Sequence, residues 1–88
     1  MPSSSGRFLY NQMIIGTTIT NLSSGRTIFG VLIKPDPDNI GKIYIGDSDV
    51  STTTGYLLEG SLFIEIDEQS KIYLISDTPD QKVYYIGV

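Results

Sequence analysis

The chain has 88 residues and contains neither cysteine nor histidine, which excludes disulfides, Cys/His metal sites and histidine-based catalysis. Its length fits one domain with one modest core, so association with partner subunits is the stabilising device that remains available. The net charge of −4, with six basic residues spread singly, argues against a nucleic-acid partner, and no apolar run reaches the roughly 18 residues of a membrane span.

Residues 1–6 are polar and rich in serine, which predicts a flexible N-terminal arm, and residues 7–88 are expected to form a single domain. An arm that docks onto a neighbouring subunit is the functional alternative. The opening MPSSSGR has no basic segment followed by an apolar one, so we expect no signal peptide and synthesis in a cytoplasm.

The composition predicts an all-β fold. Isoleucine, valine, threonine, tyrosine and phenylalanine dominate the apolar and semi-polar positions, and alanine, the best helix former, is absent. Clusters of Gly, Pro, Asp, Asn and Ser separate the apolar runs and are typical of turns. About seven strands follow at the spacing of a sandwich, at residues 7–15, 27–34, 42–46, 56–60, 61–67, 71–76 and 82–88.

The expected architecture is a single small antiparallel β-sandwich, jelly-roll or Ig-like. A small barrel stays open as an alternative, because strand pairing is not visible in the pattern. Residues 42–88 are expected to form a meander, with a rigid turn at 35–41 before them and a long polar loop at 47–55 within them.

Some predicted strands are apolar on one face and others on both. Residues 61–67 alternate cleanly, with Leu62, Ile64 and Ile66 on one side. Residues 27–34, 71–76 and 82–88 are apolar on both sides, which is more apolar surface than a lone small domain needs. This excess predicts a protein interface.

No constellation of residues predicts catalysis. Ser70 and Lys71 are the one candidate dyad, but adjacent residues on a strand point to opposite faces. The acidic pairs all lie in turns, where Asp is favoured for local hydrogen bonds. We therefore expect no enzyme, no catalytic residue and no cofactor.

A calcium loop is the more serious candidate for a site. Asp36, Asp38, Gly41 and Asp47 match loop positions 1, 3, 6 and 12 of an EF-hand count, but Ile40 stands at position 5 and cannot act as a ligand through its side chain. The flanking segments are also predicted strands, so no metal site is expected.

The segment IYIGDSDVSTTTGYLLEGSLFIEIDEQSKIYLIS, followed by KVYYIGV, resembles a widespread group of small tailed-bacteriophage virion proteins. In that group a strand ending in YVG precedes (G/D)S-x-V-(S/T)-x-(S/T)-x-G, a Leu-rich turn, an alternating strand and a strand like LYAIS. The upstream IKPDPDNIGKIYIG is similar to that group's I-x-A-x-P-x-N-x-G-x-V-Y-V-G. The matching residues are Tyr44 to Gly46, Ser48, Val50, Gly55, Leu57, Leu58, the 62/64/66 strand and Tyr73 to Ser76. The turn LLEGS at residues 57–61 departs from the usual Pro-x-x-Pro-Gly-Glu-Ser.

The resemblance implies a non-enzymatic virion structural protein that binds and stabilises the outer capsid lattice as a decoration protein. The implied partners are the major capsid protein or another virion protein, and further copies of the chain, with a trimer as one option. A tail, collar or fibre-associated protein and a receptor- or glycan-binding module are the alternatives. The residues expected at the interface are Phe29, Tyr44, Tyr73, Tyr84, Ser3, Arg7, Asp47 and Tyr56.

Overall fold

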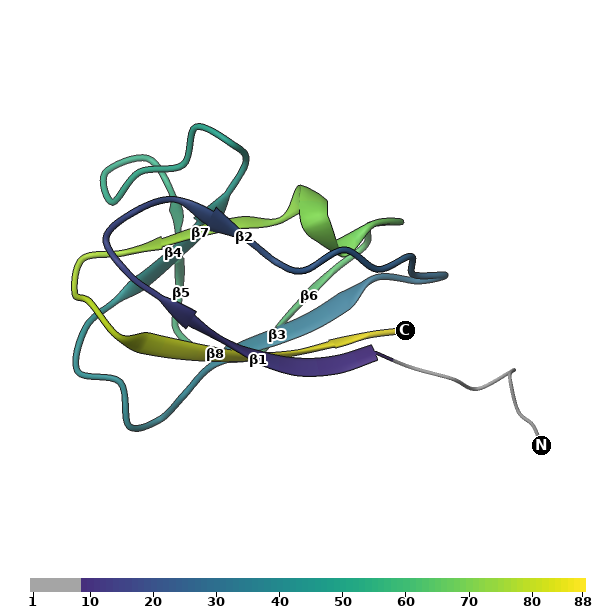
Figure 1. The fold of residues 1–88 in the computed structure, drawn as a ribbon, viewed down its shortest axis with the longest axis horizontal. Helices are drawn as coiled ribbons and strands as arrows, with labels where there is room; N and C mark the ends of the chain where they lie inside the picture. The colour runs from purple at the N-terminus through teal and green to yellow at the C-terminus, as the bar shows by residue number, and fades with distance from the viewer. Residues whose placement is uncertain (1–8) are drawn as a thin grey trace.

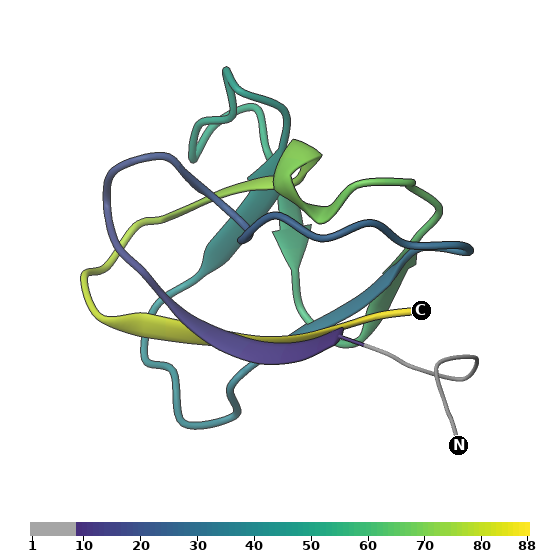
Figure 2. The ribbon, with the colours of Figure 1, turned by 45° about the vertical axis from the view of Figure 1, so that its right-hand side comes forward.

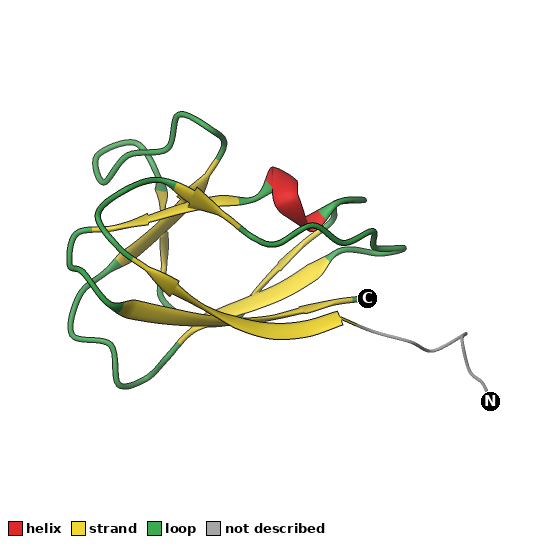
Figure 3. Ribbon diagram, viewed as in Figure 1, coloured by secondary structure: helices red, strands yellow, loops and turns green. Residues whose placement is uncertain are grey.

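The computed structural model describes residues 9–88 as eight β-strands and one short 3-10 helix (Figures 1 and 3). The helix is η1, and within the described part of the chain it is the only helix, far too short to cross a membrane. The elements are β1 (Leu9–Ile15), β2 (Thr20–Asn21), β3 (Val31–Pro35), β4 (Ile43–Gly46), β5 (Tyr56–Leu58), β6 (Leu62–Ile64), η1 (Gln69–Lys71), β7 (Tyr73–Ser76) and β8 (Gln81–Gly87).

The strands form two four-stranded antiparallel sheets, which we call sheet A, in the order β1-β8-β3-β6, and sheet B, in the order β2-β7-β4-β5. The pairs β1–β8, β2–β7, β3–β6 and β4–β5 are those of one long hairpin whose apex is the loop between β4 and β5. Pairs β3–β8 and β4–β7 then roll this hairpin into two layers, as Figures 1 and 2 show. This strand order is a jelly roll.

The predicted all-β sandwich is thus confirmed, and its jelly-roll variant is the one observed. The predicted meander over residues 42–88 is wrong. In this region β4 and β5 are the only pair of consecutive strands that are neighbours in a sheet, because the chain crosses between sheets A and B after β5, after β6 and after β7. The small-barrel alternative is also wrong, because β5 and β6 are edges of different sheets and do not pair.

The core lies between the sheets, where alternate residues of the central strands point inward. Val31 and Ile33 of β3 and Val83 and Tyr85 of β8 face sheet B, and Leu74 of β7 faces sheet A, all of them buried. The buried Tyr85 hydroxyl has a hydrogen-bond partner, because it lies 2.7 Å from the Ser23 hydroxyl. Residues 62–67 alternate in burial as predicted, although only Leu62–Ile64 pair as a strand.

Residues 27–30 do not belong to the strand predicted at 27–34. Gly30 has φ +154, and a Cβ placed there would come within 2.0 Å of the Ile64 carbonyl oxygen. The backbone N–H groups of Ile28, Phe29 and Gly30 instead all point at the Val88 carbonyl, at 3.0, 2.8 and 3.1 Å. A glycine that approaches another backbone this closely ends the strand and turns the chain.

Two further boundaries differ from the sequence-based expectation. A short strand, β2, lies at Thr20–Asn21 between the strands predicted at 7–15 and 27–34, and Leu22 directly after it is part of the core. The strand predicted at 71–76 begins only at Tyr73, because Gln69–Lys71 forms the 3-10 helix, where the Glu68 side chain accepts a hydrogen bond from the Ser70 N–H.

Candidate interaction surface

The outward face of sheet A carries a row of apolar side chains across three strands. Ile86 of β8 is directly opposite Leu32 of β3, and Leu32 is directly opposite Phe63 of β6. Side chains at opposed positions in an antiparallel pair lie on the same face and in contact range. Leu32 remains 42% exposed and Phe63 45%, so this row faces solvent rather than the core.

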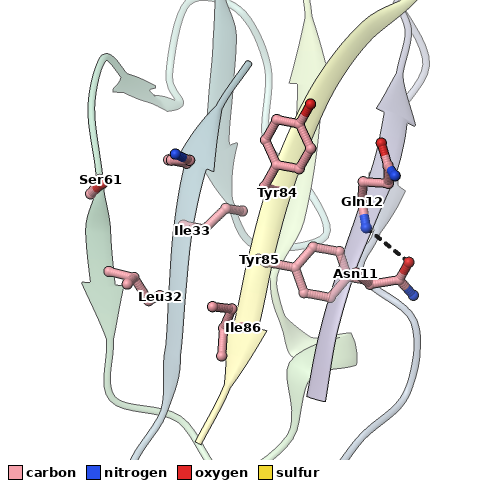
Figure 4. Close-up of a pocket in the computed structure, with 9 residues that line it drawn as sticks. Asn11, Gln12, Leu32, Ile33, Ser61, Tyr84, Tyr85 and Ile86 are labelled. Carbon is pink, nitrogen blue, oxygen red and sulfur yellow. Dashed lines mark hydrogen bonds between the residues drawn. The ribbon is translucent and has the colours of Figure 1, made fainter. Parts of the chain in front are cut away.

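A second, more polar row runs beside the first. Gln12 of β1 is paired with Tyr84 of β8, which in turn is paired with Lys34 of β3. A hollow of about 740 Å³ is lined by this polar row and by two residues of the apolar row, Leu32 and Ile86, whereas Phe63 lies outside its lining. Figure 4 shows the hollow with Leu32, Tyr84, Ile86 and Gln12 labelled. An apolar floor with polar groups along one side is the usual composition of a protein-binding surface.

Tyr84 is the best-anchored side chain of this hollow. Its hydroxyl donates a hydrogen bond of 2.9 Å to Asp36 Oδ2, and the ammonium groups of Lys34 and Lys82 each lie 6.0 Å from its ring centroid. Both distances are at the outer limit of a cation–π contact. The hydrogen bond to Asp36 therefore fixes the position of the Tyr84 ring, and two lysine ammonium groups lie near it.

Asp36 can hold the tyrosine because its own loop is tied to β8. Its N–H donates to the Lys82 carbonyl at 2.9 Å, and the Asn39 amide exchanges two hydrogen bonds of 2.8 Å with the Lys82 backbone. The Asp38 N–H, followed by the Tyr84 hydroxyl and the two lysines, holds the pKa of Asp36 below its usual value. The hydrogen bond between the Tyr84 hydroxyl and Asp36 in turn raises the pKa of Tyr84.

The outward face of sheet B is built differently. Tyr44 of β4 lies opposite Leu57 of β5 and Ile75 of β7, so this face also has an apolar row. Here, however, the loop at residues 47–55 packs Val50, only 4% exposed, beside Gly46 and Gly55, and the three residues of the row are all half-buried.

Two glycines make room for that valine. A Cβ at Gly46 would lie 2.9 Å from Val50 Cγ2, and one at Gly55 would lie 2.8 Å from the same atom and 2.7 Å from Tyr44 Cβ. All three distances are shorter than real Cβ contacts. Because the glycines allow this close approach, the loop packs against the outer face of sheet B beside Tyr44.

The residues expected at an interface do not gather on one surface. Tyr84 lies on the outer face of sheet A, and Tyr44 and Tyr73 lie half-buried on the outer face of sheet B. Asp47 is exposed in the loop that covers sheet B, where its carboxylate accepts the Asp49 N–H at 2.9 Å. The remaining four are Phe29 and Tyr56, both exposed, and Ser3 and Arg7, which lie outside the described residues.

The acidic positions of the calcium hypothesis are used for backbone turns. Asp36 accepts the Asp38 N–H, and Asp47 begins a separate turn at the other end of β4. The four residues of β4 place the two turns on the order of 13 Å apart. Within residues 9–88 no group of three or more acidic side chains could hold a metal ion.

The Ser70–Lys71 pair lies in η1, not in a strand, and its two side chains have separate partners. The Ser70 hydroxyl donates to Glu68 Oε2 at 3.0 Å, and the Lys71 ammonium binds Asp67 Oδ1 at 2.9 Å. The serine hydroxyl and the lysine ammonium thus each bind a neighbouring carboxylate and not one another.

Sequence reasoning missed the surface residues Leu32, Phe63 and Ile86 as a group. They are distant in sequence and become neighbours only through the β8–β3–β6 register. The apolar outward positions of the separate strands were the only available signal. No family model, no curated protein and no solved structure matches this chain.

Proposed function

We propose that this protein is a non-enzymatic virion subunit that binds the outer capsid lattice of a tailed bacteriophage through the outward face of sheet A. The observation that carries the proposal is the exposed row Ile86–Leu32–Phe63 beside the anchored Tyr84. A sheet face of this kind gives a partner apolar area to bury and fixed polar groups that set its orientation.

Two further considerations support the proposal. The segment that resembles small phage virion proteins begins with β4 and the loop after it, which buries Val50 beside sheet B, whereas Leu32 and Phe63 on the outer face of sheet A stay exposed. The jelly-roll order occurs in viral capsid domains, and also in lectins and cupins, so it supports the assignment by analogy alone.

The mechanism is binding linkage. A subunit that binds the assembled lattice, and not its dissociated components, stabilises the lattice by the free energy of that binding. Such a role needs a rigid complementary face and no reactive group. Rigidity of the sheet A hollow supports such a role, since its central side chains come from paired strands and Tyr84 is held by Asp36.

The test is co-sedimentation of the purified protein with phage heads assembled without it. We expect saturable binding by the wild type, and a loss of affinity of about tenfold or more when Leu32 and Phe63 are both changed to Ser. Both side chains are partly exposed, so the variant should fold. Ile19→Ser, a residue of similar exposure in the β1–β2 connection, serves as the matched control.

Failure of the wild type to sediment with such heads, or equal affinity of the double variant and the wild type, would overturn the proposal. Binding to purified tails but not to heads would indicate a tail protein and contradict the capsid assignment.

A further inference from the structure

A protruding apolar tip lies at the end of the sandwich where the chain turns into β3. Ile28 is 87% exposed and Phe29 69%, among the highest values for large apolar residues in the described chain. The tip is not loosely held: the N–H groups of both residues bind the Val88 carbonyl, and the Thr27 N–H donates to the Asp67 carbonyl at 2.9 Å. A tip whose backbone is already ordered loses little entropy on binding.

An apolar hollow lies beside this tip, where the sandwich is open between β5 and β6. It measures about 350 Å³, and an engineered cavity of only about 150 Å³ in another protein binds benzene. Its walls are mainly apolar side chains from both sheets: Ile45, Tyr56, Leu62, Ile64, Ile66 and Ile72. The one charged residue in its lining, Lys71, is neutralised by Asp67, so an entering ring meets no unpaired charge.

The tip cannot fill the hollow of its own molecule. The Thr27 hydroxyl donates to the Ile66 carbonyl, and Gly30 lies against the Ile64 carbonyl, so the backbone of the tip is fixed along the wall of the hollow. The high exposure of both tip side chains shows that they project away from the molecule.

Two copies related by a two-fold axis each offer an apolar tip and an apolar hollow to the other, so that both contacts of such a pair form together. We propose that the Ile28–Phe29 tip of one copy of this chain occupies the β5/β6 hollow of a second copy. This association uses a different face from the outer face of sheet A and stands or falls independently of the proposed capsid binding.

The absence of cysteine from the sequence makes cross-linking a clean test. Phe29→Cys and Tyr56→Cys are made as separate single variants, since Phe29 belongs to the tip, Tyr56 lines the hollow, and both are exposed. The two proteins are mixed and oxidised. The mixed disulfide dimer should form about tenfold or more faster than the one between Tyr56→Cys and the control Ile40→Cys, whose exposed position lies on the β3–β4 loop.

Sedimentation of the full chain gives the second readout. The wild type should approach twice the chain mass of 9.7 kDa as its concentration rises, and Phe29→Ser should remain at the monomer mass while keeping a wild-type circular dichroism spectrum. A wild type that stays monomeric, or equal cross-linking of the tip and control cysteines, would overturn the inference. Co-sedimentation with heads by a monomeric protein would leave the proposed function intact and remove only this one.

Discussion

The two outer faces of the sandwich carry similar apolar rows but differ in how much of them is exposed to solvent. Each has an apolar row across its two central strands and one edge strand, Ile86–Leu32–Phe63 on sheet A and Ile75–Tyr44–Leu57 on sheet B. On sheet B the row is half-buried and the loop after β4 buries Val50 beside it, whereas on sheet A Leu32 and Phe63 stay exposed. The apolar pattern of a strand therefore does not tell which face meets a partner.

The difference arises from the loops. The loop at 47–55 is the apex of the rolled hairpin. Because Gly46 and Gly55 have no side chains, Val50 packs close to both of them, and Gly55 lies close to Tyr44. The loop after β3 instead forms hydrogen bonds with the Lys82 backbone, and its Asp36 accepts a hydrogen bond from Tyr84. This loop leaves the row on sheet A uncovered. One face carries a buried residue of its own loop, Val50, and the other keeps two large apolar side chains exposed.

The largest effect is expected from forcing the sheet B loop away from its face. Gly55→Ala places a Cβ 2.7 Å from Tyr44 Cβ and 2.8 Å from the Ser51 carbonyl oxygen, so loop or strand must move. We expect a loss of about 1–3 kcal/mol in the free energy of unfolding, measured by urea denaturation. Gly60→Ala is the control, since nothing lies within 4 Å of its Cβ position, and an equal loss there would contradict the account.

A matched pair of truncations compares the two faces directly. Val50→Ala removes methyl groups from a buried site and should cost about 1–2 kcal/mol. Leu32→Ala removes more carbon from sheet A, but from a partly exposed site, and should cost less than half as much in the isolated protein. The order is checked by the same urea titrations. If Leu32→Ala is the more damaging of the two, the outer face of sheet A is not a free surface.

Much of the fold could be predicted because it is encoded locally. The alternation in residues 62–67 and the turn predicted at 35–41 depend on neighbouring residues, and the absence of alanine disfavours helices; together they indicate a sandwich. The path between the sheets could not be predicted. Whether β6 follows β5 as a hairpin or crosses to β3 depends on packing between segments far apart in the sequence.

The candidate surface was harder to predict for the same reason. Apolar residues on both sides of a strand predicted an interface, and Tyr84 was among the residues expected there; what the structure shows is exposed apolar surface, such as Leu32 on β3. Yet Tyr44 looked equivalent in sequence, and only the close approach of Val50 and Gly55 separates the two tyrosines. That approach depends on loop conformation, which the residue pattern does not fix.

The smallest expected effect concerns the carboxylate that anchors Tyr84. The pKa of Asp36 is lowered in the folded protein, so its contribution to stability is fully present above its ordinary pKa of 3.8 and is lost as the pH falls through the lower folded value. Asp36→Asn should therefore be less stable than the wild type at pH 7 and approach it at about pH 2, measured by urea midpoints. The alkaline titration of tyrosine absorbance should also shift down toward 10.0, because the raised pKa of Tyr84 depends first on this hydrogen bond.

Asp38→Asn makes the same change in net charge and is the control, since in the described part of the chain its carboxylate accepts no hydrogen bond. If Asp36→Asn and Asp38→Asn show the same pH dependence, the effect is one of overall charge, and Asp36 does not anchor the tyrosine. If only Asp36→Asn flattens the acid limb and also lowers the tyrosine titration, the Asp36 carboxylate holds both the Asp38 N–H and the Tyr84 hydroxyl. Tyr84 on sheet A is then fixed by a hydrogen bond from a loop, whereas Tyr44 on sheet B is fixed by close packing against Gly55.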